Sequence, residues 1–142
     1  MRTPKVLLLI VAAAALATVA CSGGGPREVR INEAACGLRT GQRLVVGKTN
    51  RIILDNRKHD ETQIGMNLIL QDFPVVVHGQ LPEGSTIGSP FSTIRLHANP
   101  GETASVDVEP TYTGSYDATC ELSVRRENGT RLIQQLMPFD LK

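Results

Sequence analysis

The sequence predicts an all-β protein, and more specifically a Greek-key β-sandwich that follows an N-terminal signal or lipoprotein segment. Short runs rich in Val, Ile, Leu and Thr alternate with Gly, Pro, Asn and Asp, which is typical of short strands joined by turns. No long stretch shows the 3.6-residue spacing of an amphipathic helix. About 120 residues follow the signal segment, which is enough for one domain with a single core.

The predicted strands follow one another at short intervals. In several of them apolar and polar residues alternate, as at Val29 and Ile31 and again at Ile94 and Leu96, so that one face of the strand is apolar. Pro74 is placed at the start of a strand, where its missing N–H is tolerated. The predicted strands are residues 28–32, 43–46, 50–55, 66–70, 74–78, 93–98, 104–109, 116–122 and 131–137.

Residues 1–20 are predicted to be a secretory signal peptide. Arg2 and Lys5 form a basic start, and an apolar run of Leu, Ile, Val and Ala extends over residues 6–17. This run is somewhat short for a membrane-spanning helix. An ordinary signal peptide or an uncleaved anchor is the alternative to the lipid attachment described next.

The signal segment ends in Thr-Val-Ala-Cys, which resembles the bacterial lipobox, where the Cys is lipidated and becomes the mature N-terminus. We therefore expect Cys21 to carry lipid. Residues 21–27, rich in Gly, would form a flexible tether, and residues 28–142 would form the folded domain. The expected location is the extracytoplasmic face of the cell membrane or the outer envelope, held there through the lipid anchor.

Charge and motifs exclude several functional classes. Removal of the signal segment leaves 13 basic against 14 acidic residues, a net charge of −1, so no nucleic acid is expected as a partner. The chain contains no Gly-x-Ser-x-Gly elbow, no phosphate-binding Gly loop and no His-Glu-x-x-His motif. Its acidic residues are scattered, with no evident acid–base pair, and we therefore predict that it is not an enzyme.

Two cysteines remain once Cys21 is lipidated. Cys36 and Cys120 would lie in an oxidising compartment, where a disulfide persists, and we favour their pairing because Cys36 would otherwise be a spare thiol. A crosslink between positions so distant in the chain stabilises a fold by about 4 kcal/mol in the chain-entropy account. The alternative is a free thiolate at Cys120 that is reserved for a metal.

The segment that ends at Thr130 resembles the copper-binding segment of bacterial cupredoxins of the plastocyanin and azurin type. In that family a strand of the form G-x-Y-x-x-x-C continues into C-x4-H-x3-G-M, and the Cys, His and Met bind copper. Gly114, Tyr116 and Cys120 match the strand. The position of the His holds Arg125, and the position of the Met holds Thr130.

Two further stretches support the resemblance. Residues 51–56 look like the family strand that ends in an Asn, and residues 97–110 look like its Pro-Gly turn and the strand that follows. The resemblance covers most of residues 29–137 and implies a cupredoxin-like Greek-key sandwich.

The copper ligands that the resemblance implies are largely replaced. A blue-copper site uses a thiolate, two imidazoles and a weak axial thioether. Arg125 brings a fixed positive charge that repels a metal, and Thr130 brings a hard hydroxyl. For the first His, the distance from Asn56 selects His59, whereas the strand pattern selects Met66, which we prefer.

We therefore expect a non-catalytic binding or structural module with a degenerate cupredoxin-like domain and no cofactor. The alternative is a copper-binding electron-transfer or copper-handling protein with an altered site built from Cys120, Met66 and His59. The expected partner is an unidentified envelope protein or small ligand, bound by strand edges or by loops such as residues 79–91. His78 is expected to be a strand-end residue rather than a ligand, and His97 is expected to be solvated.

Overall fold

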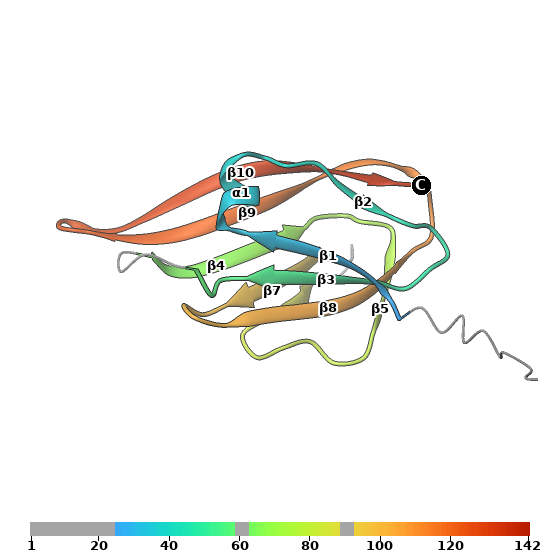
Figure 1. Cartoon of the computed structure of the whole chain (residues 1–142), viewed down its shortest axis with the longest axis horizontal. Helices are drawn as coiled ribbons and strands as arrows, with labels where there is room; N and C mark the ends of the chain where they lie inside the picture. Colours follow the sequence, from blue (N-terminus) through green and yellow to red (C-terminus); the bar gives the residue numbers. More distant parts are fainter. Residues whose placement is uncertain (1–24, 59–62, 89–92) are drawn as a thin grey trace, which may run out of the picture.

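The computed structural model describes residues 25–58, 63–88 and 93–142, and Figure 1 shows its elements. The expected all-β fold is confirmed, with one five-residue helix in the described part of the chain. In chain order the elements are β1 (Arg27–Asn32), α1 (Glu33–Gly37), β2 (Gln42–Leu44), β3 (Asn50–Asp55), β4 (Gln63–Leu70), β5 (Val75–His78), β6 (Thr86–Gly88), β7 (Thr93–Ala98), β8 (Thr103–Pro110), β9 (Gly114–Arg126) and β10 (Gly129–Leu141).

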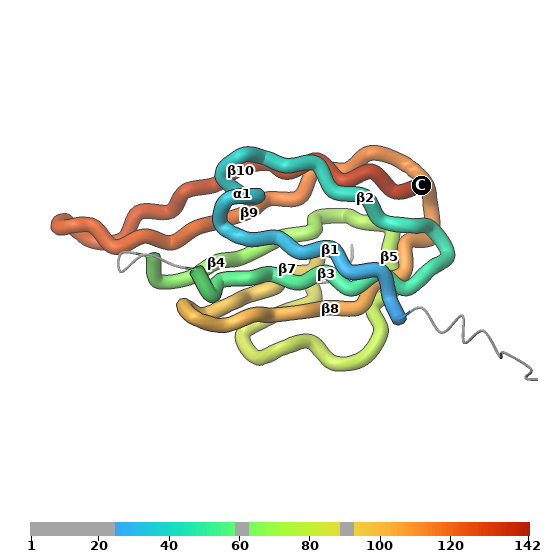
Figure 2. The backbone as a smooth tube through the Cα atoms, in the orientation of Figure 1, coloured from blue at the N-terminus to red at the C-terminus, as the bar shows by residue number. Residues whose placement is uncertain are grey.

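The strands form two sheets. One has the order β1-β3-β8-β5, and the other has the order β2-β10-β9-β4-β7-β6. Both are mixed, because β1 runs parallel to β3 and β2 runs parallel to β10 while the other pairs are antiparallel. Figure 2 shows the two layers and the connections between them.

The two sheets share one hydrophobic core. Apolar side chains from alternate positions of both sheets are buried in a single cluster, as the strand period of two requires. The core is mainly aliphatic. Phe73 is its aromatic centre, with ring centroids 5.4 Å from both Tyr116 and Phe139.

The last two strands are much longer than the sequence pattern predicts. β9 and β10 are paired along their whole length. Gly114 is opposite Leu141 at one end, Arg126 is opposite Gly129 at the other, and a two-residue turn joins the strands at the tip. This hairpin extends well beyond the rest of the sandwich (Figure 1). The sequence-based ends at residues 122 and 131 are wrong because the intervening residues are polar and look like a loop, whereas cross-strand pairing keeps them extended.

Two short elements were not predicted. β6 pairs with β7 at the edge of the six-stranded sheet. α1 begins after Asn32, whose side-chain oxygen accepts a hydrogen bond from the Ala35 N–H at 2.8 Å. Asn is a favoured N-cap residue, so this local contact starts a helix immediately after a strand.

Several predicted features lie outside the described residues. They are the signal peptide at 1–20, the lipidation site at Cys21 and His59. Among the residues that the structure describes, no helix is long and apolar enough to cross a membrane.

Candidate functional site

Cys120 lies in the middle of β9, on the face that points into the core. It is opposite Leu68 of β4 and Gln135 of β10, and it is fully buried. Its sulfur is bonded to that of Cys36 in α1, and the two Cα atoms are 5.8 Å apart. The predicted disulfide is confirmed.

The disulfide joins the two sheets. Cys36 is held by α1, which directly follows the edge strand β1 of the four-stranded sheet, whereas Cys120 belongs to a central strand of the other sheet. α1 also packs against β9 and β10, so the side chain of Cys36 is directed into the core and is fully buried. The bond therefore holds the two layers together from within.

Met66 is a core residue close to the disulfide. It lies on β4 opposite Leu122 of β9 and Ala98 of β7. The next inward-facing pair along the same two strands is Leu68 and Cys120. Its side chain is fully buried. An apolar setting of this kind is the usual role of methionine, whose flexible thioether fills gaps in a core.

Arg125 and Thr130 lie far from this cluster. They are opposite each other near the tip of the β9–β10 hairpin, and both are exposed. Arg125 is five residues beyond Cys120 in the same strand, which places it about 17 Å away along the strand. An odd number of residues also puts the two side chains on opposite faces of the sheet. The structure therefore separates the positions that a cupredoxin brings together around copper.

Asn56, which in the resemblance precedes the first ligand, has a structural role. It is almost fully buried after β3, and its side-chain amide donates to the Ala98 carbonyl at 3.1 Å. Its side-chain oxygen accepts from the amide of Gln63 at the start of β4. The residue thus ties strands of the two sheets together.

Metal-ligating residues do not gather in the described part of the chain. No group of three or more His, Cys, Asp and Glu residues there could hold a metal ion. The side chain of His78 is hydrogen-bonded to Glu109 at 3.1 Å. His97 is placed between the side-chain oxygens of Asn67 at 2.8 Å and Asn99 at 3.2 Å.

A buried carboxylate on the outer face of the six-stranded sheet was not anticipated from the sequence. Glu121 is only 4% exposed, although the alternation of β9 points it away from the core. Its oxygens accept hydrogen bonds from Arg95 at 2.8 Å and Gln134 at 2.7 Å, with Asn67 at 3.4 Å. These neighbours come from three other parts of the chain, so no local sequence signal could have revealed the cluster.

The loop after β5, proposed from the sequence as a binding loop, is partly tied down. The Ser85 hydroxyl accepts a hydrogen bond from the His97 N–H at 3.0 Å, and β6 continues the sheet from there. A Cβ atom at Gly84 would lie 3.0 Å from the His97 ring, so the loop passes close to it. Residues 89–91 of the predicted loop lie outside the described part of the chain.

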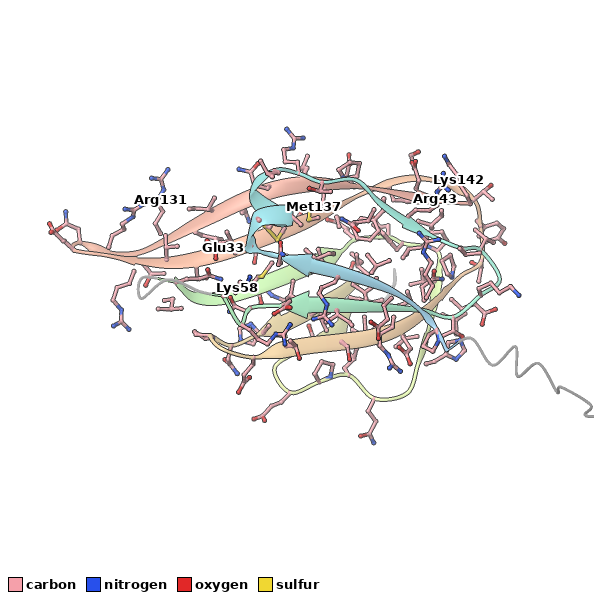
Figure 3. The ribbon with its side chains drawn as sticks, in the orientation of Figure 1. Glu33, Arg43, Lys58, Arg131, Met137 and Lys142 are labelled. Atoms are coloured by element: carbon pink, nitrogen blue, oxygen red, sulfur yellow. A yellow bond between two sulfur atoms is a disulfide. The ribbon has the colours of Figure 1, made fainter. Side chains whose placement is uncertain are left out.

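A surface cavity lies where β3 ends beside the start of α1. Its volume is about 620 Å³, and its lining residues are Asn32, Glu33, Ala34, Asp55, Arg57 and Lys58. Figure 3 labels two of them, Glu33 and Lys58, on the side of the sandwich from which the hairpin projects.

The acid in this cavity is held by two arginines. Asp55 accepts hydrogen bonds from Arg57 at 2.9 and 2.7 Å and from Arg30 at 2.8 Å. The hydrogen bond from Arg57, which outweighs the opposing effect of burial, holds the pKa of Asp55 far below its usual range. A carboxylate that stays ionised in this way is poorly matched to proton transfer near neutral pH.

A row of polar and charged side chains crosses the outer face of the four-stranded sheet. Glu28, Arg51, Asp107 and His78 are opposite one another on β1, β3, β8 and β5. Arg51 donates two hydrogen bonds of 2.7 and 2.9 Å to the carboxylate of Asp107, and these lower the pKa of that carboxyl. Such cross-strand pairs contribute to sheet stability.

Comparisons with known proteins give no family. No family model and no curated protein matches the chain. Among solved structures, the solution structure of Amebosin is similar at 17% identity over 83% of this chain and 98% of the other, with a TM-score of 0.28. A TM-score this low carries no information about fold or function.

Proposed function

We propose that this chain is a lipid-anchored extracytoplasmic protein whose cupredoxin-like Greek-key domain is a non-catalytic binding or structural module and does not hold type 1 copper. The observation that carries the proposal is the bond between Cys120 and Cys36. A disulfide sulfur is not a thiolate, and a type 1 site needs the thiolate as its strongest ligand.

The other positions of the family site support the same conclusion. Met66 offers a thioether, but it is buried among apolar side chains, and Arg125 and Thr130 are exposed at a distant tip. Among the described residues no group of three or more His, Cys, Asp and Glu could hold a metal ion, and one thioether by itself is too weak a donor set for copper in either oxidation state. The residues that match the family site therefore serve the core and the surface instead.

The disulfide also supports the proposed location. Disulfides persist in secreted and envelope compartments and are rare in the cytosol. The apolar segment that ends at Cys21 is the expected means of export and attachment. The partner is then an envelope protein or a small ligand, and the membrane is contacted through the lipid.

Two measurements test the copper part of this proposal. The full chain, produced in an oxidising compartment, is titrated with Cu(II) while the visible spectrum is followed, and its thiols are labelled with and without reductant. We expect no intense thiolate-to-copper band and two thiols that react only after reduction. A stoichiometric blue or green colour, or a freely reactive Cys120, would instead support the altered site with Met66 and His59.

The anchor is tested separately. Intact-mass measurement of the chain from membranes should show a mature N-terminus at Cys21 with added lipid. The Cys21→Ser variant should carry no lipid, whereas the disulfide should remain. A wild-type chain that carries no lipid and keeps residues 1–20 in the membrane fraction would identify an uncleaved anchor and contradict the lipoprotein proposal.

A further inference from the structure

The six-stranded sheet has an unpaired edge along β10. Only Phe139–Leu141 of this strand pairs with β2. Arg39 closes the next position, because its Nε donates a hydrogen bond to the Leu136 carbonyl at 3.0 Å. Among the described residues, no strand pairs with residues 129–135 on that side, and we call this segment the open edge.

Two contacts fix the direction of the backbone groups in β10. The Leu136 carbonyl points to the edge side, toward Arg39. Lys142 points the same way, since its N–H donates to the Leu44 carbonyl at 3.0 Å and its carbonyl accepts from the Val46 N–H at 2.9 Å. In an antiparallel strand the N–H and C=O of one residue point to the same side, and neighbouring residues alternate. Even-numbered residues of β10 therefore face the edge.

The open edge consequently presents a complete set of strand donors and acceptors. The N–H and C=O groups of Thr130, Leu132 and Gln134 point outward, while those of the intervening residues pair with β9. Pro138 is also an even-numbered residue and faces the edge. Its missing N–H therefore removes no hydrogen bond to β9. An unpaired row of this kind is a template for a further strand.

The hairpin tip beside the open edge is strongly cationic. Arg125, Arg126 and Arg131 are exposed around the hairpin tip and form no ion pair with any residue that the structure describes. Glu127 is the acidic residue among them. Figure 3 shows Arg131 out on the hairpin, beyond the body of the sandwich. Leu132, next to it, is 49% exposed and adds an apolar contact.

The hairpin tip lies at the far end of the molecule from the start of β1 at Arg27 (Figure 1). A lipid on Cys21 would be joined to β1 by only a few residues. A flexible tether at that end allows the tip to lie away from the membrane that holds the lipid. The open edge is then accessible to other molecules of the envelope.

We propose that the open edge of β10 binds an extended, acidic segment of a partner protein, which adds a strand beside β10 while its carboxylates are attracted to the arginines of the hairpin tip. This inference rests on the proposed function, because it names the surface that such a binding module uses. Charge complementarity selects the partner, since like charges oppose each other and opposite charges attract across an interface. A second copy of the chain would bring its own arginines and is disfavoured for that reason.

The test uses the full chain in mild detergent and a synthetic eight-residue peptide of alternating Glu and Val. Binding is followed by calorimetry and by amide hydrogen exchange. We expect saturable binding that weakens with salt. The N–H groups of Thr130, Leu132 and Gln134 should become protected only on binding, whereas that of Ile133 should be protected already by its pairing with β9.

Matched variants separate backbone pairing from charge. Leu132→Pro removes an N–H that points to the open edge, at an even-numbered position like that of Pro138. It should weaken binding about tenfold or more, and a tenfold change corresponds to about 1.4 kcal/mol. Leu132→Thr keeps the N–H and should bind within about threefold, because the ladder is intact. Neutralising Arg125, Arg126 and Arg131 to Gln should weaken binding and flatten its salt dependence. A Glu-Val peptide that is N-methylated at alternate residues lacks the N–H groups that would pair with β10. It therefore tests the same backbone hydrogen bonds without altering the protein.

Other outcomes would overturn the proposal. One such outcome is the absence of saturable binding. Another is equally tight binding of a peptide of alternating Glu and Pro, which cannot form a strand, or of a peptide of alternating Lys and Val, which has the opposite charge. Binding to vesicles of anionic lipid without peptide binding would assign the arginines to a membrane instead. A concentration-dependent dimer that Leu132→Pro abolishes would identify a second copy as the occupant. Failure of peptide binding with the disulfide intact and no copper bound would reject this inference alone and leave the proposed function standing.

Discussion

Cys120 and Arg125 lie on opposite faces of β9, although the cupredoxin resemblance places both positions beside one copper ion. Cys120 is fully buried and bonded to Cys36, whereas Arg125 is exposed near the hairpin tip. In a loop, two residues five positions apart can lie close together. In an extended strand they are far apart, and their side chains point to opposite faces. The continuation of β9 to Arg126 therefore separates two positions that the resemblance would place together.

The disulfide should make a large contribution to stability. Replacing Cys36 and Cys120 together with Ala is expected to lower the free energy of unfolding by about 2 to 5 kcal/mol, because the crosslink closes a long segment of the unfolded chain. Denaturant unfolding with and without reductant measures this difference. Reductant should bring the wild-type chain close to the double variant and leave the double variant unchanged. A double variant as stable as the wild type would contradict the prediction.

Met66 should behave as a packing residue. Met66→Ala leaves a cavity in a fully buried position and is expected to cost about 2 to 5 kcal/mol. Met66→Leu keeps the volume and should cost less than about 1.5 kcal/mol. Thermal unfolding of both variants, each with and without Cu(II), provides the measurement. Stabilisation of the wild type by copper that Met66→Leu abolishes would show that Met66 is a ligand.

Glu121 should be important for the sheet although it faces outward. Glu121→Gln replaces the acceptor of Arg95 and Gln134 in a nearly buried position and is expected to cost about 1 to 3 kcal/mol. Glu127→Gln, at the exposed hairpin turn, is the matched control and should leave stability within experimental error. Urea unfolding of the two variants compares them directly. Equal stability of Glu121→Gln and the wild type would mean that the network contributes nothing.

Asp55 should make the protein sensitive to acid. Arg57 and Arg30 depress the pKa of Asp55 in the folded protein, whereas in the unfolded chain an Asp titrates near its ordinary value of about 3.9. The unfolded chain therefore binds the proton first as the pH falls. This contribution to stability is fully present above the unfolded-state pKa and is lost progressively below about pH 4.

The Asp55→Asn variant tests this linkage. It should be less stable than the wild type at pH 7, and the difference should shrink as the pH falls from about 4 toward 2. Urea unfolding at a series of pH values gives the two curves. Asp72→Asn, at an exposed turn, should follow the wild-type curve throughout. Parallel curves for the wild type and Asp55→Asn would show that the ion pair does not stabilise the fold.

Much of the fold follows from local patterns in the sequence. The alternation around Val29 and Ile94 correctly predicts strands that bury one face, and the pairing of Cys36 with Cys120 follows once Cys21 is assigned to the lipid. The signal peptide and the lipid on Cys21 remain predictions. The limits of β9 and β10 were missed because their polar ends look like a loop until they are paired.

The amino-acid sequence by itself determined the all-β class, because strand alternation can be recognised from neighbouring residues. It favoured the pair of Cys36 and Cys120, because few cysteines leave few pairings, and the structure confirmed that pair. Only the tertiary structure decided that Glu121 is buried on an outer face, that Arg125 points away from Cys120, and that β10 has an open edge. Each of these depends on which strands pair and how far their pairing continues. Such contacts join residues distant in the chain, so no local pattern encodes them.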